Sequence, residues 1–149
     1  MSGDRADDQL RAQLVAQIER WLEGSDGTVD HAEEVERRWA VRIRQEVRDA
    51  TTIWFDVGSR SIWFEAYVLP APPGDLLEVY RQALIRNQRS WRAFFALDTE
   101  GAVVLRGRLT ASTSLPDDLD RALAEVYEMV EVAFPAMVAA GFPKREKSD

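Results

Sequence analysis

Cysteine and histidine, which enzymes often use as nucleophiles or metal ligands, are absent or rare in this chain of 149 residues. It contains no cysteine, which excludes a thiolate nucleophile, a disulfide and a cysteine zinc site. Its one histidine, His31, stands in a polar segment without a second candidate ligand, so we expect a solvated side chain there. No glycine-rich phosphate loop, serine nucleophile elbow or dinucleotide fingerprint occurs in the sequence. These residues predict a protein that is not an enzyme and that uses no cofactor and no metal.

Carboxylates are the chemically active groups that the chain has in number, with 26 Asp and Glu residues. A paired-acid hydrolase needs two of them in one cleft at a defined separation. Many of the acids stand in runs such as HAEEVERR and PDDLDRA, which are typical of solvated helical faces. The segment Asp98-Thr99-Glu100-Gly101 lacks the other ligands of a calcium loop and predicts a turn. A carboxylate hydrolase therefore stays the third of three hypotheses, behind two kinds of binding protein.

The tripeptide IWF occurs twice in this sequence, before and after the turn GSRS. If both copies are strands, one face carries phenylalanines, and the other carries Trp54, Trp63 and Tyr67. Exposed aromatic patches mark interfaces, so we predict that these three residues bind a partner. Two alternatives stay open. A chain segment or a dimer mate covers the rings permanently, or Asp56 and Glu65 simply screen isolated rings.

Five arginines lie in or beside the first expected strand, namely Arg37, Arg38, Arg42, Arg44 and Arg48. They could bind an anionic ligand or the acidic first helix of a neighbouring molecule. Their alternation favours a solvated outer face that protects an edge strand. The formal net charge of -7 opposes sequence-independent binding to nucleic acid or to an anionic membrane surface. We expect a protein client as the partner, with a small molecule as the alternative.

Two segments in the first two thirds of the chain have the three-and-four apolar spacing of amphipathic helices. The first runs from about Asp7 to Leu22. The second is capped by Asp75 and ends near Asn87, because asparagine tolerates left-handed dihedrals. The apolar stripe of the second helix consists of Leu76, Leu77, Tyr80 and Leu84.

A third and longer helix is predicted near the end of the chain. It begins at Ser114, whose hydroxyl can cap it, and Pro135 should bend it. Gly141 can close it in a left-handed conformation. The whole chain, residues 1–149, reads as one domain with flexible tails at about 1–6 and 143–149.

Elsewhere the apolar period changes to two, which indicates strands at about residues 39–44, 51–57, 61–69, 91–97 and 102–109. The segment EGSDGTVDH predicts a turn, and HAEEVERR adds a short helical turn. The tight turn GSRS fixes the register of the second and third strands. It pairs Val57 with Ile62, Phe55 with Phe64, Ile53 with Ala66, Trp54 with Glu65 and Asp56 with Trp63.

The resulting order is α-β-β-β-α-β-β-α. It predicts an α+β fold in which helices pack on one side of an antiparallel sheet. No apolar run reaches the roughly 20 residues that a membrane helix needs, and the sequence shows no signal peptide. We therefore expect a cytoplasmic protein.

A family resemblance emerges from the C-terminal two thirds, where the segment YVLPAPPGDLLEVYRQALIRNQRSWRAFFALDTEGAVVLRGRL is similar to the YbjN pattern. That pattern has a strand ending in a proline turn, a helix running into asparagine, and a hairpin with an Asp-x-x-Gly turn. The matching positions here are Pro70, Asn87, Asp98 and Gly101, and the closing helix ends in Gly-Phe. The element order also resembles that of type III secretion chaperones, whose fold the YbjN family shares.

The resemblance implies a small acidic homodimer without enzymatic activity, described as a regulator of sensory transduction. It also implies a dimer contact on the middle helix, Asp75 to Asn87, and the neighbouring sheet, for which we take Leu77, Tyr80 and Leu84. Apolar periodicity by itself does not distinguish such a contact from core packing. Our first hypothesis is a chaperone-like adaptor that binds a protein segment on an apolar surface of its sheet and helices. The alternative is a small-molecule sensor whose pocket lies between sheet and helices and is lined by the tryptophans.

Overall fold

The computed structural model describes residues 2–24 and 26–144, which contain three α-helices and six β-strands. In chain order they are α1 (Ser2–Glu23), β1 (Val29–Val35), β2 (Arg38–Arg44), β3 (Ala50–Gly58), β4 (Ser61–Leu69), α2 (Leu76–Asn87), β5 (Phe94–Leu97), β6 (Val103–Thr110) and α3 (Leu115–Gly141). The α+β class is confirmed. The first strand, β1, is one that the sequence pattern does not predict.

All six strands form one sheet in the order β1-β2-β3-β4-β6-β5, and every neighbouring pair is antiparallel. The register of the central hairpin, β3 with β4, is the predicted one throughout. Phe55 lies opposite Phe64, and Trp54 lies opposite Glu65. Because side chains alternate between the two faces of a strand, this register separates the phenylalanines from the tryptophans.

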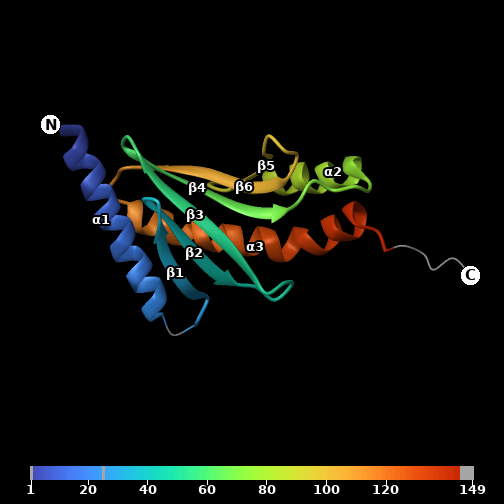
Figure 1. Ribbon diagram of the computed structural model, residues 1–149, viewed down its shortest axis with the longest axis horizontal. Coiled ribbons are helices and arrows are strands. Elements are labelled where there is room, and N and C mark those ends of the chain that lie inside the picture. Colours follow the sequence, from blue (N-terminus) through green and yellow to red (C-terminus); the bar gives the residue numbers. More distant parts are fainter. Residues whose placement is uncertain (1, 25, 145–149) are drawn as a thin grey trace, which may run out of the picture.

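Helices α1 and α3 cover one face of the sheet, and α2 packs against α3 and β5 (Figure 1). The covered face holds the hydrophobic core, which is built from residues of the sheet and of all three helices. Aromatic rings connect its layers, since the Trp21 ring lies 5.9 Å from Phe55, and Phe55 lies 6.1 Å from Phe64. The opposite face of the sheet is turned away from the helices. No helix among residues 2–24 and 26–144 combines the length and apolar content that crossing a bilayer requires.

Strand β1 corrects the interpretation of the segment before β2. That segment predicts a turn and a short helical turn, but residues 29–35 pair with β2 as the edge strand of the sheet. His31 consequently lies on a strand and not in a loop. The hairpin closes through Glu36 and Arg37, whose φ angles are 51° and 72°. Since β2 is an inner strand, the interpretation of its arginines as protection of an edge strand is wrong.

The starts of α2 and α3 agree with the sequence in position, although one cap differs in chemistry. The Asp75 carboxylate accepts a hydrogen bond from the Glu78 N–H at 3.1 Å, as expected for the cap of α2. At the start of α3, the Ser114 hydroxyl makes no cap bond to the backbone and donates instead to the Asp118 carboxylate at 3.1 Å. The predicted hydroxyl cap is therefore wrong.

Helical structure extends closer to the N-terminus than the sequence pattern predicts. Helix α1 begins at Ser2, ahead of the expected start at Asp7, so residues 2–6 are helical. Residues 145–149 of the expected C-terminal tail lie outside the described residues. Pro135 stands inside α3, and the turns that follow it, drawn in red, rise toward α2 (Figure 1).

The two predicted helix ends, at Gly141 and Asn87, do not use left-handed dihedrals. Close packing explains the glycine, and side-chain hydrogen bonds explain the asparagine. Gly141 belongs to α3 and has no positive φ, but a Cβ on it would lie 2.8 Å from the Pro72 Cβ. Asn87 also has no positive φ. Its side-chain amide accepts the Phe95 N–H at 2.7 Å and donates to the Phe95 carbonyl at 3.1 Å. Asn87 thus attaches the end of α2 to β5, because an amide can match both polar groups of one backbone residue.

Candidate functional site

The open face of the sheet carries the three aromatic residues that the sequence singles out. Trp54 comes from β3, and Trp63 and Tyr67 come from β4. Trp63 is 47% exposed and Tyr67 is 51% exposed, whereas Trp54 is half-buried. In the described chain, therefore, no internal segment covers Trp63 and Tyr67.

Arginines from neighbouring strands lie over these tryptophans. The guanidinium carbon of Arg38 lies 4.8 Å from the centre of the Trp54 ring, and that of Arg108 lies 4.8 Å from the centre of the Trp63 ring. Cation–π contacts at exposed sites contribute about 0.5–1 kcal/mol each. On the same face, Arg106 donates to the Glu65 carboxylate from Nη2 at 2.6 Å and from Nε at 2.8 Å.

These side chains surround a shallow hollow of about 340 Å³ whose lining includes Arg38, Trp54, Asp56, Trp63, Glu65 and Arg106. Tyr67 lies outside this hollow on the same strand face, opposite Val104 of β6. Among the described residues, neither Arg38 nor Arg108 forms an ion pair. The face thus offers flat aromatic area together with two guanidinium groups that lack a carboxylate partner.

A second apolar surface runs along α2 and the edge strand β5. Leu77 is 80% exposed and Leu84 is 66% exposed, because Val79 and Ala83 are the residues that α2 turns toward the core. The stripe that the sequence predicts is therefore largely on the outside of the molecule. An almost wholly apolar groove of about 260 Å³ lies beside it, lined by Tyr80, Ala83, Leu84, Phe95, Ala96, Leu97 and Val103.

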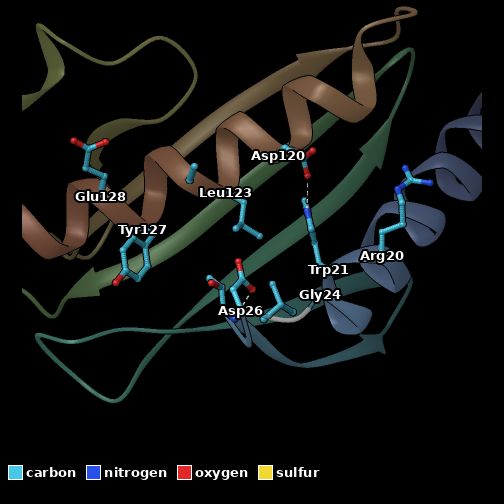
Figure 2. A pocket seen from close by; sticks show the side chains of 11 residues that line it. Arg20, Trp21, Gly24, Asp26, Asp120, Leu123, Tyr127 and Glu128 are labelled. Atoms are coloured by element: carbon cyan, nitrogen blue, oxygen red, sulfur yellow. Dashed lines mark hydrogen bonds between the residues drawn. The ribbon is translucent and has the colours of Figure 1, made fainter.

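A hollow of about 620 Å³ lies between the end of α1, the start of β1 and α3 (Figure 2). Trp21 is its tryptophan, not Trp54 or Trp63, so the lining expected for a sensor pocket differs from the one observed. The Trp21 indole N–H donates to the Asp120 carboxylate at 2.7 Å. Partial burial raises the pKa of the Tyr127 phenol, and the nearby carboxylates of Glu131 and Glu46 raise it further.

Two acidic residues of α3 are engaged by backbone groups. The Glu125 carboxylate accepts the N–H groups of residues 91–93 at 2.8–3.0 Å. The Glu131 carboxylate accepts the amide of Gln45 at 2.7 Å and the backbone N–H groups of residues 46 and 47. Both residues therefore hold loops in place. In the part of the chain that the structure describes, no cluster of three His, Cys, Asp or Glu residues suits a metal ion.

Arg48 also has a structural role, so its interpretation as a solvated outer-face arginine is wrong. Its guanidinium donates to the carbonyls of Val68 at 2.7 Å and Tyr67 at 2.9 Å, where the pairing of β4 with β6 is irregular. The same group lies 4.8 Å from the centre of the Phe134 ring. Burial lowers the pKa of Arg48 below its ordinary value.

The sequence located the aromatic residues of the open face but not their arginine neighbours on β6. The alternation of Arg106 and Arg108 indicates that both lie on one face of their strand. It places them beside the tryptophans only when the pairing of β6 with β4 is known. No local sequence pattern indicates the hollow in Figure 2, because two of its residues, Trp21 and Asp120, are 99 residues apart in the chain.

Comparison with known proteins places the chain in a family. A model of the YbjN family, described as "Putative bacterial sensory transduction regulator", matches residues 14–139. An uncharacterized protein of Mycobacterium leprae, ML2442, is 33% identical over 105 residues, which are 70% of this chain and 57% of that protein. An uncharacterized protein of Mycobacterium tuberculosis, Rv0487, is 36% identical over 86 residues, which are 58% of this chain and 47% of that protein. The chain thus spans about half the length of the curated relatives it matches.

Two solved structures align with most of this chain. YbjN from E. coli aligns with a TM-score of 0.50 at 15% identity, over 84% of this chain and 90% of that chain. A chain of the heterodimeric ExoU–SpcU complex, from the type III secretion system of Pseudomonas aeruginosa, aligns with a TM-score of 0.46 at 18% identity, over 87% and 98%. The first likeness shows a shared fold.

Proposed function

The chain belongs to the YbjN family, and from this premise we propose that it is a non-enzymatic adaptor or regulator that binds a segment of another protein. The binding site is the open face of the sheet around Trp54, Trp63 and Tyr67. One observation carries the proposal: these rings stand on a sheet face that none of the described helices covers, and two of them are about half exposed. Tryptophan, tyrosine and arginine are the side chains most enriched at binding hot spots.

The arginines of this face define the chemistry of the partner. Arg38 and Arg108 are held against tryptophan rings and have no carboxylate partner among the described residues. A bound segment that places apolar side chains on the rings and Asp or Glu beside the guanidinium groups would satisfy both. We therefore expect an apolar segment with interspersed acidic residues.

We also propose that the protein is a homodimer whose contact is the outer face of α2, with Leu77, Tyr80 and Leu84. Support comes from the exposure of the two leucines and from the apolar groove that Tyr80 and Leu84 share with β5. Edge strands offer unpaired backbone groups to a second chain, and β5 is one of the two edges of this sheet. The client face and the dimer face thus use different residues.

The test of the adaptor proposal is capture of partners from an extract of the cells that make the protein. The bait is the wild type or the double variant Trp54→Ala/Trp63→Ala, and captured proteins are identified by mass spectrometry. The matched control is Trp91→Ala, because Trp91 is exposed but lies outside this face. Urea unfolding and circular dichroism establish that each bait is folded.

We expect proteins that are captured by wild type and by Trp91→Ala but lost with the double variant. Calorimetry with the purified partner should then show a loss of affinity of at least about a hundredfold, since each buried large side chain contributes roughly 1.5–3 kcal/mol. Identical capture by all three folded baits would contradict the proposal.

A second candidate function is a small-molecule sensor. The observation that favours it is the hollow of Figure 2, whose volume of about 620 Å³ is within the usual 300–1,000 Å³ range of ligand pockets. It shares no residue with the open sheet face.

A further inference from the structure

The hollow between α1, β1 and α3 has the size and the walls of a small-molecule site. Figure 2 shows Trp21 and Tyr127 at opposite sides of it, with Leu123 reaching in from α3 and Asp26 from the loop before β1. Val29 adds to its apolar part. Two aromatic rings and aliphatic side chains can contact an apolar ligand of modest size.

The charges around the hollow are predominantly negative. Asp120 accepts the Trp21 indole N–H and the Gln17 amide through Oδ1, while Asp26 accepts the Thr28 N–H at 3.0 Å through Oδ1. The second oxygen of each carboxylate has no hydrogen-bond donor among the described residues. Each of these carboxylates therefore has one oxygen that can accept a hydrogen bond from a ligand.

The arginines near the hollow do not cancel this charge at its centre. Arg20 lines it, but its guanidinium donates to the Gln17 side-chain carbonyl and points away in Figure 2. Glu128 also points away in that view. Arg44 belongs to the adjoining hollow of about 370 Å³, which it shares with Asp26, Glu46 and Tyr127.

We propose that this hollow binds a small organic cation, an ammonium group joined to an apolar or aromatic body. Trp21 and Tyr127 each offer an aromatic ring that can attract an ammonium group, and Asp26 and Asp120 supply the countercharge. The formal net charge of -7 attracts cations to the molecule in general. This inference rests on the second candidate function, and names the class of ligand.

The test uses three probes of similar shape and different charge: phenethylammonium, 2-phenylethanol and phenylacetate. The readout is the indole N–H resonance of Trp21 in ¹H–¹⁵N spectra, identified by its loss in Trp21→Phe, and each dissociation constant comes from titration of that resonance. We expect phenethylammonium to bind at least about tenfold more tightly than the neutral probe, with no binding of phenylacetate. Equal binding of all three probes, preference for the anion, or no shift with any probe would overturn the proposal.

Asparagine variants locate the site. Asp26→Asn and Asp120→Asn keep one side-chain oxygen that can accept the Thr28 and Trp21 hydrogens, and they replace the negative charge and the second acceptor oxygen with an NH2 group. Each should weaken phenethylammonium by about three- to tenfold and leave 2-phenylethanol unchanged. Asp56→Asn, on the open sheet face, is the matched control and should change neither affinity.

The same titration separates this inference from the adaptor proposal. The folded Trp54→Ala/Trp63→Ala variant should bind phenethylammonium like wild type, because its substitutions lie outside the hollow. A variant that loses protein partners but keeps the cation supports both ideas. Asp26→Asn and Asp120→Asn variants that bind the cation like wild type sink this inference alone.

Discussion

At the scale of single residues, a few polar side chains hold the irregular parts of the chain to its regular elements. Glu125 and Glu131 accept backbone N–H groups of two loops, Asn87 pairs with the backbone of Phe95, and Arg48 donates to two carbonyls of β4. Hydrogen bonds to charged groups contribute about 1.5–3 kcal/mol each. The carboxylates of Glu125 and Glu131, which by their number alone left a hydrolase possible, therefore stabilise the fold at these positions.

At Gly107 on β6, the surrounding atoms leave no room for a side chain. A Cβ at this position on β6 would lie 2.1 Å from the Arg92 carbonyl oxygen and 2.4 Å from Cζ of Phe64. We expect Gly107→Ala to lower the free energy of unfolding by about 3 kcal/mol, since neither the backbone nor the buried ring can move aside easily. Urea unfolding measures this change.

Gly58→Ala is the matched control for Gly107→Ala. Its added Cβ would be at an ordinary 3.4 Å from the Trp63 ring, and Gly58 has no positive φ. Its effect should stay within about 1 kcal/mol. Equal stabilities of the two alanine variants would contradict the crowding inferred at Gly107.

Tyr127 makes the stability depend on pH in the alkaline range. Burial, followed by the Glu131 and Glu46 carboxylates, raises the pKa of this phenol above its ordinary value of 10.0. As pH rises above about 10, the unfolded chain therefore loses the Tyr127 proton before the folded chain does, and the folded state loses stability. Below that pH both states keep the proton, and this contribution is unchanged.

Tyr127→Phe tests this dependence. The free energy of unfolding of wild type should fall more steeply above pH 10 than that of the variant, and tyrosinate absorbance should show one phenol fewer that titrates late. Parallel curves for the two proteins would mean that the surroundings of Tyr127 do not oppose its ionisation.

At the scale of elements, the β1–β2 hairpin is the part of the fold that the sequence described least well. Residues 30–34 are DHAEE, which carries little strand propensity. The strand is an edge strand, pairs on one side only and contains an irregularity after Val29. Acidic residues are tolerated there because one edge of the strand faces solvent.

The turn of this hairpin should be a place where stability can be gained. Both turn residues, Glu36 and Arg37, have positive φ, which costs non-glycine residues about 1 kcal/mol each. Since Asn-Gly is the preferred pair for such a two-residue turn, Glu36→Asn/Arg37→Gly should raise the free energy of unfolding by about 1 kcal/mol. The urea midpoint should rise, and an unchanged or lower midpoint would mean that the original side chains stabilise the turn in another way.

At the scale of the whole molecule, the fold leaves two kinds of surface free by covering the sheet on one face only. α1 and α3 bury one face, the other face presents tryptophan and arginine, and α2 with β5 presents leucine at one end (Figure 1). Exposed leucines such as Leu77 and Leu84 are unusual on a monomer when they adjoin an apolar groove.

Self-association follows as a prediction at this scale. Wild type should sediment as a dimer at micromolar concentration, and Leu77→Glu/Leu84→Glu should weaken the dimer by at least about a hundredfold, since it places two charges in an apolar contact. Leu22→Glu, an exposed leucine on α1, is the control and should remain dimeric. Sedimentation of wild type as a monomer would refute the dimer.

Much of the fold follows from the sequence alone because its causes are local. The register of β3 with β4 is set by a two-residue turn and an alternating pattern, and the cap of α2 depends on Asp75 and the first helical turn. The turn at Asp98 is equally local, since its carboxylate accepts N–H groups two and four residues ahead. Each of these features is complete within a few residues of chain.

The tertiary structure decided the features whose partners are distant in sequence. Periodicity placed Leu77 and Leu84 on an apolar stripe, but only the packing of α2 on α3 shows that this stripe faces outward. The hollow beside Trp21 exists because α1 and α3 meet there, with Asp120 supplied from 99 residues away. Trp54 and Trp63 were assigned to one face by local alternation, whereas their arginine neighbour Arg108 depends on the pairing of β4 with β6. Local patterns determine which face of an element a residue occupies, and the packing of elements determines what that face meets.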